Sequence, residues 1–98
     1  MITVNPQKAL DILKAKFTAQ VQKYLDESAQ SKGYDNILSA CTYATSAVPK
    51  FQVEGQAAVE FRDAVWSKCY ESFDEVQAGT RGIPTEQELI QELPTLDW

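Results

Sequence analysis

The chain has 98 residues, 44% of them hydrophobic and ten of them aromatic, which is enough for one domain and unlike the composition of disordered chains. Its formal net charge of −5 argues against nucleic acid as a partner, because phosphate binding depends on clustered Lys and Arg. No apolar run approaches the ~20 residues of a membrane-spanning helix, and residues 1–8 lack the regions of a signal peptide. We therefore expect a cytoplasmic protein that binds no membrane and loses no leader.

The charge is divided unevenly along the chain. Residues 1–34 carry a net charge of +2, whereas residues 35–98 carry −7. A basic first helix packed against an acidic later one would use this asymmetry within the fold. Each exposed pair would contribute only about 0–1 kcal/mol.

The first predicted helix spans about residues 6–31. Asn5 followed by Pro6 is typical of an N-cap with proline at the first helical position. Gly33 can take the left-handed conformation that ends helices. Ile12 lies opposite the apolar stripe and is expected to be exposed, which is compatible with a homo-oligomer. The stripe recurs at steps of three and four residues and comprises Leu10, Leu13, Phe17, Val21, Tyr24 and Leu25.

A short second helix is predicted at about residues 35–45, with Asp35 as its N-cap. Its apolar residues leave little polar surface, which indicates burial. The residue before Pro49 is pushed out of the helical region, so the helix should end before it. Cys41 here and Cys69 later both fall at apolar helical positions, and we expect free, buried thiols.

The third predicted helix spans about residues 50–78 and ends at Gly79. Its apolar residues cover an arc of about 180°, which is too wide for one neighbouring helix. We therefore expect it to be the central helix, with the first helix antiparallel to it on one side. The residues of this arc are Ala58, Val59, Phe61, Val65, Trp66, Cys69, Tyr70, Phe73 and Val76.

Thr85 with Glu88 three residues later forms a capping box, which predicts a short helix at about residues 85–93 that Pro94 ends. Residues 94–98 then form a non-helical tail. Strand-like alternation and internal repeats are lacking in the sequence. The prediction is a single all-α domain over residues 1–98, a small bundle of two long antiparallel helices and two short ones.

The sequence offers little for catalysis or metal binding. It has no His, which removes the commonest general base and metal ligand. Two separated Cys do not make a zinc site, and neither a phosphate-binding loop nor a nucleophile elbow is present. The acidic residues of the third helix fall on its polar side. We expect no catalytic residue, no cofactor and no metal, and hence no enzyme.

Arg62 is the unusual residue, because its helical phase places it within the apolar arc of the third helix. Its side chain could reach past its neighbours to water. It could instead form an internal ion pair, with Asp35 as a candidate carboxylate, or hydrogen bonds to the carbonyls at a helix end. A contact with another molecule is the third interpretation.

Three aromatic residues are candidates for partner contact, namely Trp66, Tyr70 and Trp98, because aromatic side chains supply much of the energy at interface hot spots. The competing interpretation for Trp66 and Tyr70 is packing in the core of so small a domain. Trp98 is expected on a loose tail, where contact with a partner is easier.

A series of short segments along the chain carries a resemblance to a known family. In order, the segments are GYDNILSACTYA at 33–44, Pro49 and Phe51, EG at 54–55, RDAVW at 62–66, Cys69 and Tyr70, 74–79, and ELP at 92–94. This ordered set resembles a family of small proteins encoded among the tail genes of tailed bacteriophages and prophages. The resemblance covers the chain from about Leu10 onward, and some relatives carry this segment at the end of a longer chain.

This resemblance implies a role in virion assembly and no catalytic residues. The expected function is that of a tail-associated protein, either a structural component or an assembly factor, with tail-fibre assembly as one such role. Its partners would be tail or tail-fibre proteins, in the cytoplasm of the bacterial host or in the virion. The alternative is a small acidic phage protein that binds and modulates a host protein, which the charge of −7 over residues 35–98 would suit.

Overall fold

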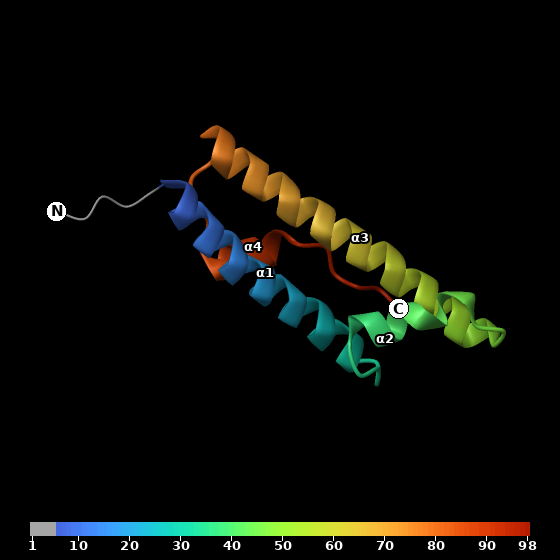
Figure 1. Cartoon of the computed structure of the whole chain (residues 1–98). Coiled ribbons are helices and arrows are strands. Elements are labelled where there is room, and N and C mark those ends of the chain that lie inside the picture. The colour runs from blue at the N-terminus through green and yellow to red at the C-terminus, as the bar shows by residue number, and fades with distance from the viewer. Residues whose placement is uncertain (1–5) are drawn as a thin grey trace.

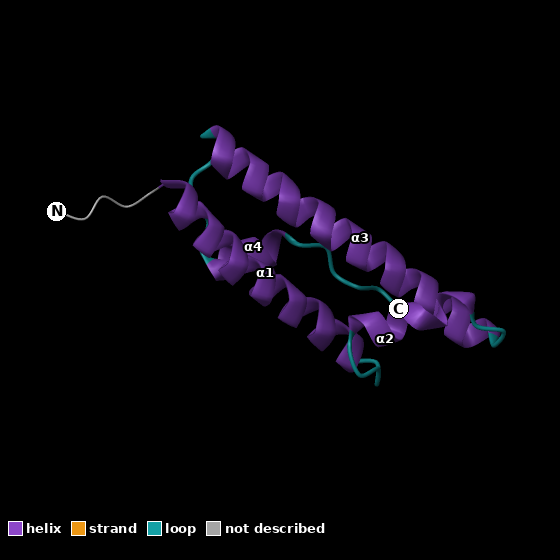
Figure 2. Ribbon diagram, in the orientation of Figure 1, coloured by secondary structure: helices purple, strands orange, loops and turns teal. Residues whose placement is uncertain are grey.

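The computed structural model describes residues 6–98, which form helices joined by short loops (Figures 1 and 2). The elements in chain order are α1 (Pro6–Gln30), α2 (Ile37–Cys41), the 3-10 helix η1 (Thr42–Thr45), α3 (Pro49–Ala78) and α4 (Glu86–Glu92). No strand occurs in the described part of the chain. The all-α prediction is confirmed at this level, and residues 94–98 are non-helical as predicted. Asn5 and the side chain of Leu10 lie outside the described residues.

The second helix differs from its prediction. Only five residues are α-helical, and the chain then tightens into η1. The prediction that Asp35 caps this helix is wrong, because Asn36 is the N-cap and its side chain accepts a hydrogen bond from the Ser39 N–H at 2.7 Å. Asp26 of α1 accepts a second bond, from the Ile37 N–H at 3.1 Å. Two N–H groups of the first turn of α2, which have no partner within the helix, are therefore bonded without any contribution from the exposed Asp35.

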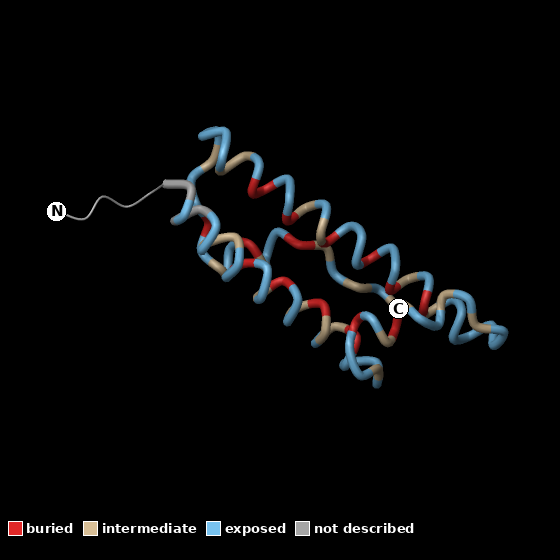
Figure 3. Tube along the Cα trace, viewed as in Figure 1, coloured by how far each residue is buried: buried red, intermediate tan, exposed pale blue. Residues whose placement is uncertain are grey.

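The core lies along the facing sides of α1 and α3, where buried residues recur along both helices (Figure 3). Phe17 stacks on Phe73 with ring centroids 6.1 Å apart, and Tyr24 contacts Phe61 at 6.0 Å. Helix α4 packs against α1 from one side. The side chains with under 1% exposure are Val21, Leu25, Ala29, Ala40, Ala58, Val65, Cys69 and Leu89.

Gly55 is where α3 meets η1 most closely. A Cβ atom at this position would lie 2.2 Å from the backbone nitrogen of Ala44 and 2.3 Å from the carbonyl carbon of Tyr43. Neither backbone atom can move without moving η1. Glycine therefore allows η1 to rest directly on the α3 backbone, which positions the start of α3.

The tail is packed against the helices, so the expectation of a loose tail is wrong. Figure 1 shows it running between α1 and α3 toward α2. The Tyr24 hydroxyl donates a hydrogen bond to the Pro94 carbonyl at 2.8 Å, and the Trp98 ring stacks on Tyr34 at 5.6 Å. Burial of two aromatic faces outweighs the freedom of a short tail. None of the described helices is both long enough and apolar enough to cross a membrane.

Candidate functional site

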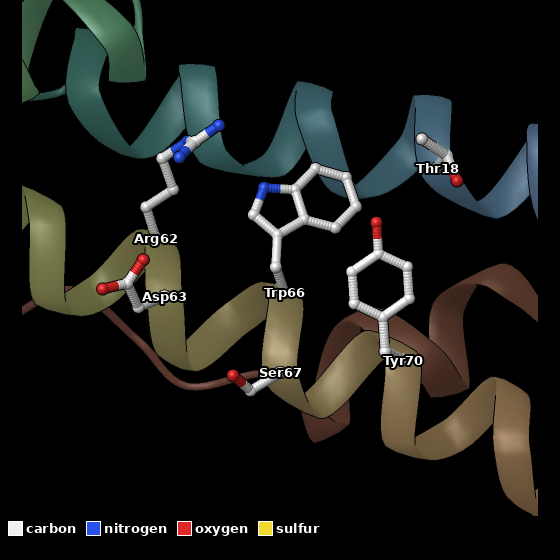
Figure 4. Close-up of a pocket in the computed structure, with 6 residues that line it drawn as sticks. All are labelled: Thr18, Arg62, Asp63, Trp66, Ser67 and Tyr70. Atoms are coloured by element: carbon white, nitrogen blue, oxygen red, sulfur yellow. The ribbon is translucent and has the colours of Figure 1, made fainter.

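An open groove lies along the surface between α1 and α3, and Figure 4 shows its lining. Trp66 and Tyr70 point from α3 toward α1 and form an aromatic floor. One residue of the lining comes from α1 and five come from α3. They are Thr18, Arg62, Asp63, Trp66, Ser67 and Tyr70.

The aromatic floor is produced by helical spacing. Arg62, Trp66 and Tyr70 are four residues apart and therefore lie on one face of α3. Trp66 is half-buried and packs on the core, while Tyr70 is 61% exposed. The Trp66 and Tyr70 ring centroids are 6.1 Å apart, and Tyr70 also contacts the buried Phe73 at 6.5 Å. The floor is thus an exposed aromatic surface held in place by the core.

Arg62 is exposed at one end of this floor. The internal ion pair with Asp35 is not found, since no ion pair or hydrogen bond joins Arg62 to any residue in 6–98. The guanidinium reaches water along the groove, which avoids the cost of burying a charge. Of the three interpretations, the internal pair is wrong, and a contact with another molecule stays a prediction.

The groove has an acidic edge. Asp63 lines the groove, and Asp74 follows Tyr70 by four residues on the same face of α3. Both are exposed, as are Glu60 and Glu71 further around the helix. Within the described chain, only Glu71 among them forms a salt bridge, with Lys68 at 4.0 Å. Aromatic and acidic side chains therefore lie side by side on one rigid helix, a combination suited to a ligand with both apolar and basic groups.

The groove offers no sign of metal or nucleophilic chemistry in the described residues. No group of three or more Cys, Asp or Glu there could hold a metal ion. Cys69 is buried and Cys41 half-buried, both as free thiols. Burial raises the pKa of the Cys69 thiol, and burial is also the main reason that the pKa of Cys41 is raised. A raised pKa keeps both in the less reactive thiol form.

The structure does not bring the other candidate residues to this groove. Ile12 is 63% exposed, but it lies about 120° around α1 from Thr18, on the outer face of the helix. Trp98 lies near α2, against Tyr34. The candidates therefore divide into a groove set of Arg62, Trp66 and Tyr70, and two separate positions.

Some residues of interest were missed by sequence reasoning. Thr18 lines the groove, but its role depends on which face of α1 meets α3. An aromatic cluster at the α2 end joins Tyr34, Tyr43, Phe51 and Trp98 in successive ring contacts of 5.4–5.6 Å. These four residues come from four segments, so no periodicity in the sequence connects them.

Comparison with protein-family models, with curated proteins and with solved structures finds no match to this chain.

Proposed function

We propose that this chain is a bacteriophage tail-associated protein, a structural component or an assembly factor, that acts by protein–protein contact and catalyses no reaction. The observation that carries the proposal is the groove, where Tyr70 exposes 61% of its surface beside Trp66. Exposed aromatic residues on a rigid helix are typical of interface hot spots. The resemblance of the GYD, SACTYA, RDAVW and ELP segments to tail-region proteins supplies the biological setting.

The partner is a tail or tail-fibre protein, met in the cytoplasm of the bacterial host. The test is a pull-down of the tagged protein from infected or prophage-induced cells, with mass spectrometry of the bound proteins and of purified virions. Recovery of a tail protein supports the proposal. Copies in the virion identify a component, and their absence identifies an assembly factor.

A matched variant tests the groove itself. Tyr70→Ala removes the exposed aromatic side chain, whereas Ile83→Ala removes an equally exposed apolar side chain, 64% exposed, outside the groove. Recovery of the tail protein should fall only with Tyr70→Ala. If both variants recover it as well as wild type, the groove is not the contact. If only host proteins are recovered, the protein is a modulator of a host factor, a role that the acidic edge of Glu60, Asp63 and Asp74 would suit.

The proposal also requires that α1 and α3 stay packed antiparallel in solution, because residues of both helices line the groove. Support comes from the ring contacts, since Phe17 meets Phe73 while Tyr24, further along α1, meets the earlier residue Phe61. Nuclear Overhauser effects in solution should connect the same two ring pairs. Nuclear Overhauser effects that connect Phe17 with Phe61, in place of these two ring pairs, would contradict the antiparallel pairing.

A further inference from the structure

We propose that the groove of one copy receives the outer face of α1 of a second copy, so that the protein assembles head to tail. The inference rests on the proposed function only in taking the groove to be a protein-contact site. It goes further by naming the occupant. Two surfaces of this chain, on different helices, match each other in spacing, size and charge.

The first surface is the outer face of α1. Five exposed residues recur along it at steps of four, three, four and four, which is the spacing of one helical face. Ile12 is the large apolar side chain of this face, and two alanines beside it let another helix approach closely. In order, the five are Lys8, Ile12, Ala15, Ala19 and Lys23. We call this set the α1 outer face.

The second surface is on α3 and has the same steps. It begins at the half-exposed Val59, passes through the aromatic floor and ends one turn beyond it. The α1 outer face carries two lysines, and this surface carries two carboxylates. Its residues are Val59, Asp63, Trp66, Tyr70 and Asp74. We call this set the α3 groove face.

Antiparallel docking brings the two surfaces into register. With Tyr70 opposite Ile12, the bulky Trp66 lies opposite the small Ala15. Large side chains then fit against small ones, as packing of helices requires.

The same register pairs the charges. Asp74 lies opposite Lys8, and Lys23 lies within a turn of Glu60 and Asp63. Lys23 is free to move, since its side chain is 69% exposed and its contact with Glu27 is 3.9 Å long. Opposite charges at an interface favour this register and speed association.

Face-to-face pairing of two groove faces is disfavoured by the same charges. It would place the acidic edges of two copies together, where their carboxylates repel each other. Asp63 and Asp74 form no ion pair within the described residues of their own chain that would offset this repulsion. Pairing of groove face with outer face leaves one free surface at each end of every open assembly. Such a contact closes into a ring or continues as a chain, in contrast to a symmetric dimer.

The first test is the mass of the 11.0 kDa chain in solution by sedimentation velocity over a range of concentrations. The wild type should exceed twice the monomer mass as concentration rises. Ile12→Asp and Tyr70→Asp each place a carboxylate opposite an apolar side chain. Each should weaken association about thirtyfold or more, as hot-spot substitutions do. Ile83→Asp is the control and should assemble like the wild type, because Ile83 belongs to neither face.

The second test separates head-to-tail from symmetric association. Ile12→Asp keeps an intact groove face, and Tyr70→Asp keeps an intact α1 outer face. Mixed together, the two variants should form a 1:1 dimer and nothing larger. A wild type that stays monomeric at every concentration overturns the inference, as does a mixture that stays monomeric while the wild type assembles. Circular dichroism should show that both variants remain helical, as the control for folding.

The outcomes also separate this inference from the proposed function. A monomeric wild type that still captures a tail protein through Tyr70 overturns self-assembly and leaves the proposed function standing. A protein that assembles head to tail, but is absent from virions and binds no tail protein, supports self-assembly and contradicts the proposed function.

Discussion

Gly55 shows how one missing methyl group decides the packing of η1 on α3. Alanine favours helix over glycine by about 1 kcal/mol, so Gly55→Ala would stabilise an isolated α3. In the fold its Cβ would lie 2.2 Å from the Ala44 backbone nitrogen. We expect a net loss of about 1–3 kcal/mol, because η1 must move away. The measurement is the free energy of urea unfolding.

Gly82→Ala is the matched control, since no heavy atom lies within 4 Å of a Cβ atom built there. Its stability should stay within about 0.5 kcal/mol of wild type. A stability unchanged in Gly55→Ala would show that η1 is not held against α3.

Tyr34 should make stability depend on alkaline pH. Its hydroxyl donates a hydrogen bond to Glu54, which together with burial raises the pKa of Tyr34 from 10.0 to about 12. A raised folded-state pKa means that this stabilisation is complete below pH 10 and is lost as pH rises from 10 toward 12. Tyr34→Phe should remove roughly 1 kcal/mol at neutral pH and flatten this loss.

The difference between the unfolding free energies of wild type and Tyr34→Phe, measured from pH about 9 to about 12, isolates this group from the other tyrosines. Glu54→Gln is the companion variant, since it removes the charge that opposes ionisation. A difference that stays constant across this range would contradict the assigned hydrogen bond.

Helix α4 is held to α3 by Arg81, in the loop between them. One Arg81 nitrogen, Nη2, lies 2.6 Å from both oxygens of Glu92, and the other, Nη1, donates to the buried Ser72 hydroxyl at 3.1 Å. The Arg81 side chain is only 20% exposed, whereas the Glu92 side chain is 38% exposed, so solvent screens the contacts with Glu92 in part. Arg81→Met should lower stability by about 1–2 kcal/mol and speed hydrogen exchange in α4.

Lys68→Met is the control for Arg81→Met. Lys68 lies 4.0 Å from Glu71 on the surface of α3, in a pair expected to contribute about 0–1 kcal/mol. If the two variants changed hydrogen exchange in α4 equally, the contacts of Arg81 would not be what holds α4 to α3.

The helices were predictable because their ends carry local signals. Thr85 caps α4 by accepting a bond from the Glu88 N–H at 3.1 Å, and Gly79 ends α3 in the left-handed conformation, φ 77°. The cap of α2 was not predictable in this way. Asp35 and Asn36 are equally good caps by residue type, and a contact from Asp26 in another helix accompanies the choice of Asn36.

The groove was predictable in part. The spacing of four residues between Arg62, Trp66 and Tyr70 is enough to predict that they share one face of a helix. Their phase did not show whether that face is covered, because coverage depends on where α4 and the tail pack. Since the tail packs between the long helices and reaches Tyr34, Trp98 is held in the fold and the groove face stays open.

The tail connects α4 with the Tyr34 end of the molecule through its contacts with Tyr24 and Tyr34. Trp98→Ala removes the ring that stacks on Tyr34 and should cost about 1–2 kcal/mol, less than for a fully buried Trp. Urea unfolding measures the loss. The exposed neighbour Asp97→Ala is the control and should change little. Equal stability of the two variants would mean that the stacked ring contributes nothing.

The hydrogen bond from Tyr24 to Pro94 also bears on how the protein folds during synthesis. A ribosome adds about 5–20 residues per second, so α1 emerges seconds before its last packing partner has been made. Until residues 94–98 leave the exit tunnel, the side of α1 that meets the tail faces water or a chaperone. Native packing is therefore completed only after synthesis has passed Trp98, and a chain stalled before Pro94 would present an unfinished surface to the quality-control machinery of its cell.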